Sequence, residues 1–267
     1  MSIAATDGTV PLLLRQTHGS GIVELTLNRP EAFNSLSSAL MTELQGQLDA
    51  LTEDPEARVI VISGAGRGFC AGHDLKEVRS LATPDERRAL MAQCCRLMLS
   101  VVHHPRPVIA KVHGVASAAG CQLVASCDLA LAAADARFAT PGVNIGLFCS
   151  TPMVALGRNV SRKHAMEMLL TGEMMDAETA ERSGLINRQV PADELDARTL
   201  ELAELIASKS THTVKLGKEA FYRQLEMPLE DAYSYAAEVM VQNMLAADAR
   251  EGIAAFVEKR PPQWQDR

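Results

Sequence analysis

Two apolar runs, each followed by a turn of small residues and then by a helical pattern, constrain the fold of this chain more than any other feature. The first run, Arg58–Ser63, leads into the turn 64–74, and the second, Pro107–Val112, leads into the turn 113–128. Both runs are rich in Val and Ile, as buried strands are. Strand–turn–helix units in succession predict a parallel sheet with crossover helices, and hence an α/β fold.

Hydrophobic spacing extends this alternation over the rest of the chain. The elements expected before residue 150 are strands at 12–16 and 22–27 joined at Gly19–Gly21, a strand at 129–132, and helices at 36–51 (capped by Ser35 or Ser37), 90–101 and 118–126. After Met153 helices are expected at 165–170, 177–182, 195–207, 214–225, 229–246 and 252–257, with one strand around Asn187–Val190. We therefore expect an α/β core at 1–200 and a helical C-terminal region at 201–267, whose apolar faces pack within the chain or against another subunit.

Composition narrows the class of protein. The 267 residues carry a net charge of -7, which argues against a nucleic-acid-binding surface. The six cysteines show no C-x-x-C pair and no metal-ligand spacing, so we expect reduced thiols and no metal site. The segment Met1–Pro11 has no secretory signal pattern, and no run approaches the ~18 apolar residues of a membrane span. We expect a cytoplasmic protein that binds neither nucleic acid nor membrane.

The two turns also suggest chemistry. A strand that ends in small residues and turns into a helix leaves backbone N–H groups unpaired and directed toward one point. Two such turns side by side could direct two N–H groups at one oxygen atom, which is the arrangement of an oxyanion hole. The alternative is that the small residues only permit close packing of strand and helix. A dinucleotide site is not expected, because Phe69 stands where the G-x-G-x-x-G pattern requires glycine.

The two turns resemble the signature segments of a known family. The strings are Gly-Arg-Gly-Phe-Cys-Ala-Gly-His-Asp-Leu at 66–75 and Lys-Val-His-Gly-Val-Ala-Ser-Ala-Ala-Gly-Cys-Gln-Leu-Val-Ala-Ser-Cys-Asp at 111–128. They are similar to those of the crotonase, or enoyl-CoA hydratase/isomerase, superfamily, and most similar to its enoyl-CoA hydratase domain-containing subgroup. Segments 27–36, 165–172, 177–190 and 252–260 fit as well. The resemblance implies a ββα spiral with a helical C-terminal trimerisation region, assembled as a homotrimer or dimer of trimers.

The resemblance also implies roles for individual residues. It places the two oxyanion-hole N–H groups on His73 and Ala119 and implies an acyl-CoA thioester as substrate, with no tightly bound cofactor and no metal. The residues implied to contact coenzyme A are Arg29, Ala32, Phe33, Cys70, Ala71, Gly72, Asp74 and Leu75, together with Phe256 and Lys259, which reach a neighbouring subunit's ligand. Asp74 is also expected to cap the helix that begins at Leu75. Arg29 and Lys259 are either phosphate partners or solvated surface charges.

The chain departs from the family where the chemistry is done. Hydratases of the family use two glutamates as general base and acid, and this chain has Gln122 and Gly142 at those positions. A third acidic position, used by some isomerases, falls at Cys149. Glutamine can hold a water molecule but cannot take its proton, so hydration of crotonyl-CoA should be weak or absent. Gain of hydration on installing glutamate at both positions would show that the scaffold is intact and that only the acid/base pair is lacking.

The expected function is therefore acyl-CoA handling of the lyase type, linked by the family to fatty acid metabolism, with altered or weak activity. One alternative is a CoA-thioester decarboxylase or other lyase that uses only the oxyanion hole. The string Ala-Gly-His-Asp at 71–74 resembles a methylmalonyl-CoA decarboxylase branch, although the tyrosine of that branch falls at Cys149. A second alternative is a non-catalytic acyl-CoA-binding protein. Cys149 as a nucleophile lacks an evident base in the sequence.

Overall fold

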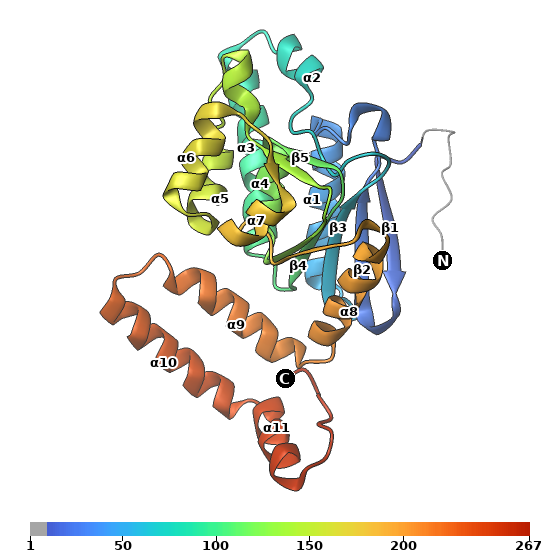
Figure 1. Cartoon of the computed structure of the whole chain (residues 1–267). Helices are drawn as coiled ribbons and strands as arrows, with labels where there is room; N and C mark the ends of the chain where they lie inside the picture. The colour runs from blue at the N-terminus through green and yellow to red at the C-terminus, as the bar shows by residue number, and fades with distance from the viewer. Residues whose placement is uncertain (1–9) are drawn as a thin grey trace.

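The computed structural model describes residues 10–267 and contains the predicted parallel sheet (Figure 1). Its six strands, in order across the sheet, are β1 (Leu13–His18), β2 (Ile22–Leu27), β3 (Val59–Gly64), β4 (Val108–Val112), β6 (Leu129–Ala133) and β9 (Arg188–Val190). β1 is antiparallel to β2, and every other neighbouring pair is parallel. The α/β class and the hairpin at Gly19–Gly21 are confirmed.

A second, smaller sheet was not predicted. It contains β5 (Val115–Ser117), β7 (Arg137–Ala139) and β8 (Met175–Asp176). The prediction of a single strand after Met153, around 187–190, is therefore wrong, because β8 also lies in that part of the chain. Strands of two or three residues are too short to show an alternation of apolar and polar residues.

Helices cover both faces of the large sheet. The helices before the C-terminal region are α1 (Ser38–Glu53), α2 (Leu75–Ser80), α3 (Pro84–Val102), α4 (Ala119–Ser126), α5 (Pro152–Asn159), α6 (Arg162–Thr171), α7 (Ala177–Ser183) and α8 (Leu195–Ala207). The main buried cluster includes apolar residues of α1, α3 and α4, and a second cluster joins α8 to the opposite face of the sheet. Ser37 is the cap of α1, since its hydroxyl accepts a hydrogen bond from Leu40 N–H at 3.2 Å. Helix α5 was missing from the sequence prediction.

The C-terminal helices α9 (Thr211–Gln224), α10 (Leu229–Leu245) and α11 (Ala247–Glu258) extend away from the sheets (Figure 1). A partly buried cluster of polar side chains attaches α9 to the core. The Lys218 ammonium donates to the Asp128 carboxylate at 2.6 Å, and the Tyr222 hydroxyl donates to the same carboxylate at 2.9 Å. The predicted division at residue 200 falls inside α8, and the two-domain division stays a prediction. None of the helices within residues 10–267 is long and apolar enough to cross a membrane.

Candidate functional site

The first small-residue turn follows β3 and leads into α2. Gly72 adopts a φ of +96°, a conformation that favours glycine. A Cβ atom at Gly72 would lie 2.8 Å from Ala118 Cβ and 3.3 Å from Ala119 N, so the two turns contact each other at this residue. Asp74 caps α2 by accepting hydrogen bonds from the Lys76 and Glu77 N–H groups, as predicted.

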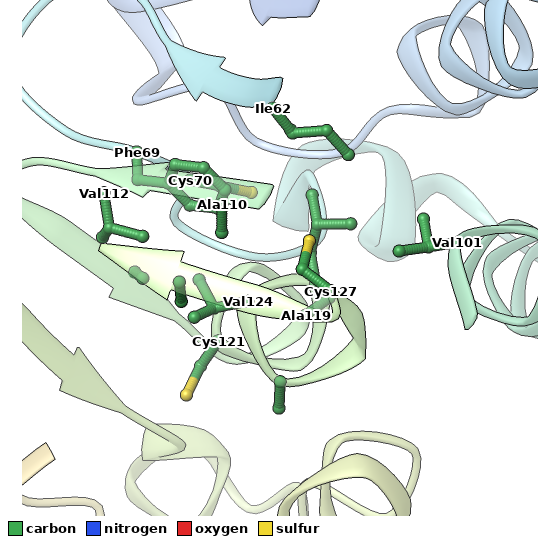
Figure 2. Packing of buried hydrophobic residues seen from close by; sticks show 14 of the residues in the cluster. Ile62, Phe69, Cys70, Val101, Ala110, Val112, Ala119, Cys121, Val124 and Cys127 are labelled. Atoms are coloured by element: carbon green, nitrogen blue, oxygen red, sulfur yellow. The ribbon is translucent and has the colours of Figure 1, made fainter. Parts of the chain in front are cut away.

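The second turn joins β5 to α4. Ala118 precedes the helix with a φ of 49° and a ψ of -116°, an unusual conformation for a residue with a side chain. Its N–H group donates to the Ala139 carbonyl of β7 at 2.9 Å. Gly120 lies against the first turn, because a Cβ atom there would be only 2.2 Å from the Cys70 carbonyl oxygen. Figure 2 shows Cys70 and Ala119 within one buried cluster.

The contact between the turns brings together two backbone donors. Ala119 is the first residue of α4, and N–H groups of the first helical turn have no partner within their helix. Among residues 10–267, neither the His73 nor the Ala119 N–H group donates a backbone or side-chain hydrogen bond, whereas neighbouring groups such as Asp74 N–H, which donates to Leu36 O, are paired. The geometry therefore leaves both predicted donors available to a ligand, and their catalytic role stays a prediction.

The imidazole side chain of His73 is mostly buried and has no proton-transfer partner of its own among the hydrogen-bonding groups described. Both ring nitrogens are buried without a hydrogen-bond partner among the described residues. Burial lowers the pKa of the imidazole, and the nearby Leu36 backbone and Glu77 carboxylate act in the opposite direction. The ring is therefore neutral near pH 7.

The two positions of the family's glutamates differ in the space that they offer. Gln122 lies in α4 with 4% of its surface exposed, and its side-chain Oε1 has no hydrogen-bond partner in the described part of the chain. At Gly142, a Cβ atom would lie 2.4 Å from the Leu147 carbonyl oxygen and 2.9 Å from Cys149 Sγ. The segment 142–149 is thus folded onto Gly142, with Leu147 N–H donating to the Gly142 carbonyl at 2.9 Å. Glutamate fits the shape of position 122 but not that of position 142.

The cysteines near the site are poor nucleophiles. All six are free thiols, and those at 121 and 149 are buried. Burial raises the pKa of Cys121 to about 12 and raises that of Cys149 as well. Both therefore stay protonated near neutral pH. Within the described residues, no group of three or more His, Cys, Asp or Glu side chains is arranged to hold a metal ion.

Several residues predicted to contact coenzyme A surround the first turn. Ala71 N–H donates to the Phe33 carbonyl at 3.0 Å, which joins the loop of Ala32 and Phe33, both predicted to contact coenzyme A, to the turn. The Arg29 guanidinium donates to the Asp74 carboxylate at 2.8 Å and to the Ser35 carbonyl at 2.7 Å. Arg29 therefore holds the turn together and is not a free surface charge. Phe256 and Lys259 lie at the end of α11, far from α2 within one chain (Figure 1).

Two residues near the site were missed in the sequence. The Arg67 guanidinium lies 5.1 Å from the centre of the Phe33 ring, which is 43% exposed. Arg67 also lines a cavity of about 550 Å³ at the carboxyl ends of β2, β3 and β4, together with the Lys111–Glu24 ion pair. Thr140, fully buried, has a hydroxyl without a hydrogen-bond partner. The basic residue within the first turn was a visible signal for Arg67, but no sequence pattern marked Thr140.

Comparisons with known proteins agree with this architecture. The chain is 46% identical over 254 residues to the mouse (Mus musculus) enoyl-CoA hydratase domain-containing protein 3, mitochondrial, which covers 95% of this chain and 85% of the relative. The crystal structure of an enoyl-CoA hydratase from Mycobacterium smegmatis matches with a TM-score of 0.94 and 50% identity, over 96% of this chain and 99% of that one. The crystal structure of the human enoyl coenzyme A hydratase domain-containing protein 3 matches with a TM-score of 0.92 and 44% identity, over 95% and 100% of the two chains.

These relatives correct the predicted location. The mouse relative and its rat, frog and human counterparts are named mitochondrial proteins, which contradicts the prediction of a cytoplasmic location. The prediction was wrong because reduced thiols and the lack of a secretory pattern argue only against oxidising compartments. They do not distinguish between the remaining compartments.

The family assignment rests on matches that cover nearly the whole chain. The turns at 66–75 and 111–128 contact each other as the resemblance implied, and the fold matches solved structures over nearly all residues. The family model described as enoyl-CoA hydratase/isomerase matches residues 17–267. The chain therefore belongs to the enoyl-CoA hydratase/isomerase family and has the crotonase fold.

Proposed function

We propose that this chain binds acyl-CoA thioesters and stabilises a thioester enolate with the backbone N–H groups of His73 and Ala119. The observation that carries the proposal is that both donors lack a partner among residues 10–267, on turns that touch at Gly72. Fixed donors stabilise the negative charge on the thioester oxygen without having to reorganise during the reaction. Coenzyme A is then part of the substrate, and the Phe33–Arg67 pair offers an aromatic face and a cation to its nucleotide end.

Water addition is not the reaction that we propose. Gln122 cannot accept a proton, and the close contacts at Gly142 leave no space for an acidic side chain. Each missing acid or base typically costs 10²–10⁴-fold, so hydration should be roughly 10⁴-fold or more below that of a hydratase with both glutamates. Loss of CO2 from a malonyl-type thioester needs no base, because the electron pair of the broken C–C bond passes directly into the enolate. A decarboxylase or similar lyase is therefore the favoured enzymatic form of the proposal.

The test compares binding with turnover. Calorimetry should detect binding of butyryl-CoA, while spectrophotometry with crotonyl-CoA should detect little or no hydration. Release of CO2 from methylmalonyl-CoA would support the lyase, and binding of every thioester without turnover would support a non-catalytic acyl-CoA-binding protein. Hydration of crotonyl-CoA at ordinary hydratase rates would contradict the proposal.

A glycine variant tests the oxyanion hole directly. Gly72→Ala places a methyl group 3.3 Å from Ala119 N, at the contact between the two turns, and should weaken acyl-CoA binding and abolish any CO2 release. Gly217→Ala in α9 is the matched control, since nothing lies within 4 Å of the added methyl group. Equal behaviour of the two variants would remove the hole from the proposal.

We also propose that the chain assembles as a homotrimer or a dimer of trimers. The proposal is supported by exposed apolar side chains on α10 and α11, among them Tyr233 at 73% and Phe256 at 85% exposure. Many large apolar side chains exposed on neighbouring helices are typical of protein interfaces. Assembly would bring Phe256 and Lys259 to a neighbour's ligand. Light scattering gives the number of subunits, and a monomer at micromolar concentration would contradict the proposal.

A further inference from the structure

The C-terminal arm, which we define as helices α9, α10 and α11, has little apolar burial against the rest of the chain. Within the described residues, no residue of α9 is fully buried, α10 buries only Ala232, and α11 buries only Asp248 and Ala255. Helices in proteins are held in place mostly by the packing of an apolar face. Because that packing is sparse here, the direction of the arm depends on its polar contacts with the core.

The last residues of the chain supply many of these contacts. We call residues 260–267 the strap. Its first residue, Arg260, forms a two-point ion pair with the Glu251 carboxylate of α11, at 2.6 and 3.0 Å. Further along the strap, the Trp264 indole N–H donates to the Ser208 carbonyl at 2.8 Å. The strap therefore runs from the end of α11 back to the joint between α8 and α9, and the C-terminus lies beside that joint (Figure 1).

A buried carboxylate attaches the strap to the arm. Asp248, near the start of α11, has only 1% of its surface exposed. Its carboxylate accepts hydrogen bonds from the Gln265 and Asp266 N–H groups at 2.7 and 2.9 Å. It also accepts one from the Ser210 hydroxyl, which in turn caps α9 by accepting from Thr213 N–H. A buried charge needs such partners to be stable, so this one carboxylate joins α9, α11 and the strap.

A second carboxylate attaches the strap to the core. Asp266 accepts a hydrogen bond at 2.7 Å from the N–H group of Thr211, the first residue of α9. Its other oxygen forms an ion pair with Arg58, which directly precedes β3. The Arg58 guanidinium also donates to the Ala207 and Lys209 carbonyls at 3.2 Å, where α8 ends. The large sheet, the joint between α8 and α9, and the strap are thus held together at one point.

We infer that the strap holds the arm in the direction that brings Phe256 and Lys259 to a neighbouring subunit's acyl-CoA, with Asp248 as the positioning residue. The inference rests on the proposed acyl-CoA site and assembly, and it adds what keeps the neighbour's contribution in place. Phe256 lies on the same helix as Asp248 and is 85% exposed. An aromatic ring and an ammonium group suit the adenine and phosphates of coenzyme A. Release of the strap would weaken these nucleotide contacts and leave the oxyanion hole unchanged.

The experiment compares the affinities of butyryl-CoA and butyryl-pantetheine, which lacks the nucleotide, for the full chain by calorimetry. Asp248→Asn keeps the shape of the side chain but replaces one acceptor oxygen with a donor. It should lower the preference for butyryl-CoA about tenfold, as the loss of one charge-assisted contact implies. Hydrogen exchange should become faster in α11 and the strap and stay unchanged in the large sheet.

Two further variants control for charge and for folding. Asp231→Asn removes the same charge from an exposed position on α10, and it should change neither the preference nor the exchange. Asp266→Asn releases the strap from Arg58 without altering the buried Asp248 carboxylate, since the Asp266 side chain is 34% exposed. It should lower the preference in the same direction as Asp248→Asn, and it decides the matter if Asp248→Asn does not fold.

A double variant tests whether Asp248 acts through a residue that touches the ligand. Phe256→Ala alone should lower the preference for butyryl-CoA, and Asp248→Asn added to it should lower the preference little further. Fully additive losses would show that Asp248 affects binding by another route and would overturn the inference. Equal losses of affinity for both thioesters, or faster exchange with an unchanged preference, would overturn it as well.

Failure of the proposed function gives a different result. If the wild-type protein binds neither thioester, the acyl-CoA site itself is wrong, and the positioning role of Asp248 fails with it. If the wild-type protein binds both thioesters equally well, the acyl-CoA site stands, but the contribution of a neighbour's arm to the nucleotide is overturned.

Discussion

Glycine residues on the two sides of the site differ in whether the space beside them is open or filled. On the turn side, residues 64–75 and 117–122, Gly72 and Gly120 let two backbones approach while the donors of His73 and Ala119 stay unpaired. On the loop side, residues 140–150, the space beside Gly142 is filled by the Leu147 carbonyl and the Cys149 thiol. A glycine in a sequence motif therefore indicates that a side chain is absent. It does not indicate whether the resulting space is open to a ligand or filled by the protein.

The largest expected effect is on the turn side. Gly120→Ala should destabilise the fold by about 3 kcal/mol, because its methyl group would meet the Cys70 carbonyl oxygen at 2.2 Å and both turns would have to move. Denaturant unfolding measures the change. Gly157→Ala in α5, with nothing within 4 Å, is the control and should be neutral or slightly stabilising. A loss no greater than that of the control would show that the turns are not tightly packed.

A smaller effect is expected on the loop side. Gly142→Ala meets the Leu147 carbonyl at 2.4 Å, but Leu147 is 53% exposed and its segment can shift outward. We expect a loss of about 1–2 kcal/mol in the same unfolding experiment. If this variant is as damaging as Gly120→Ala, the loop is as rigid as the turns and the contrast between the two sides fails.

An ion pair between Arg29 and Asp74 also stabilises the turn side of the site. Arg29 holds the pKa of the Asp74 carboxyl below its usual range. Since this pKa is lower in the folded state than in the unfolded state, the stabilisation is present above about pH 4 and is lost as the pH falls through the folded value. Asp74→Asn should cost about 1 kcal/mol near neutral pH, and its stability should change less with acid than that of the wild-type protein. Unfolding curves between about pH 7 and pH 3 that run parallel would contradict this.

The smallest effect should have the opposite sign. Ala118 has a positive φ, which costs free energy for a residue with a Cβ atom. Ala118→Gly should therefore stabilise the protein by about 0.5–1 kcal/mol, with relief of the strain exceeding the added freedom of the unfolded chain. The melting temperature measures the change. A lower melting temperature would mean that the Ala118 methyl group contributes more by packing than it costs by strain.

Features with a local sequence pattern could be predicted, and features that depend on distant segments could not. Apolar runs and small-residue turns have local signatures, so the parallel sheet, the Asp74 cap and most helices were predicted. The second sheet was not, because its strands of two or three residues pair with distant segments and carry no periodicity of their own.

The filling of the space at Gly142 could not be predicted either. It depends on how residues 147–149 fold back over the turn that begins at Pro141, and no pattern at Gly142 itself records that. The double-glutamate variant therefore tests the loop as well as the missing carboxylates, because glutamate at position 142 has to displace the Leu147 backbone. Only position 122 has the space for such a replacement.

The closed loop at Gly142 also bears on how this lineage can change. A mutation to glutamate there is simple as a genetic event, but the Leu147 carbonyl already occupies the room for its first carbon atom. The exposed loop would have to shift outward in the same step to admit that atom. Mutational routes through the two positions are therefore unequal: Gln122 can be exchanged by a side-chain change alone, whereas glutamate at position 142 also requires the backbone of the loop to move.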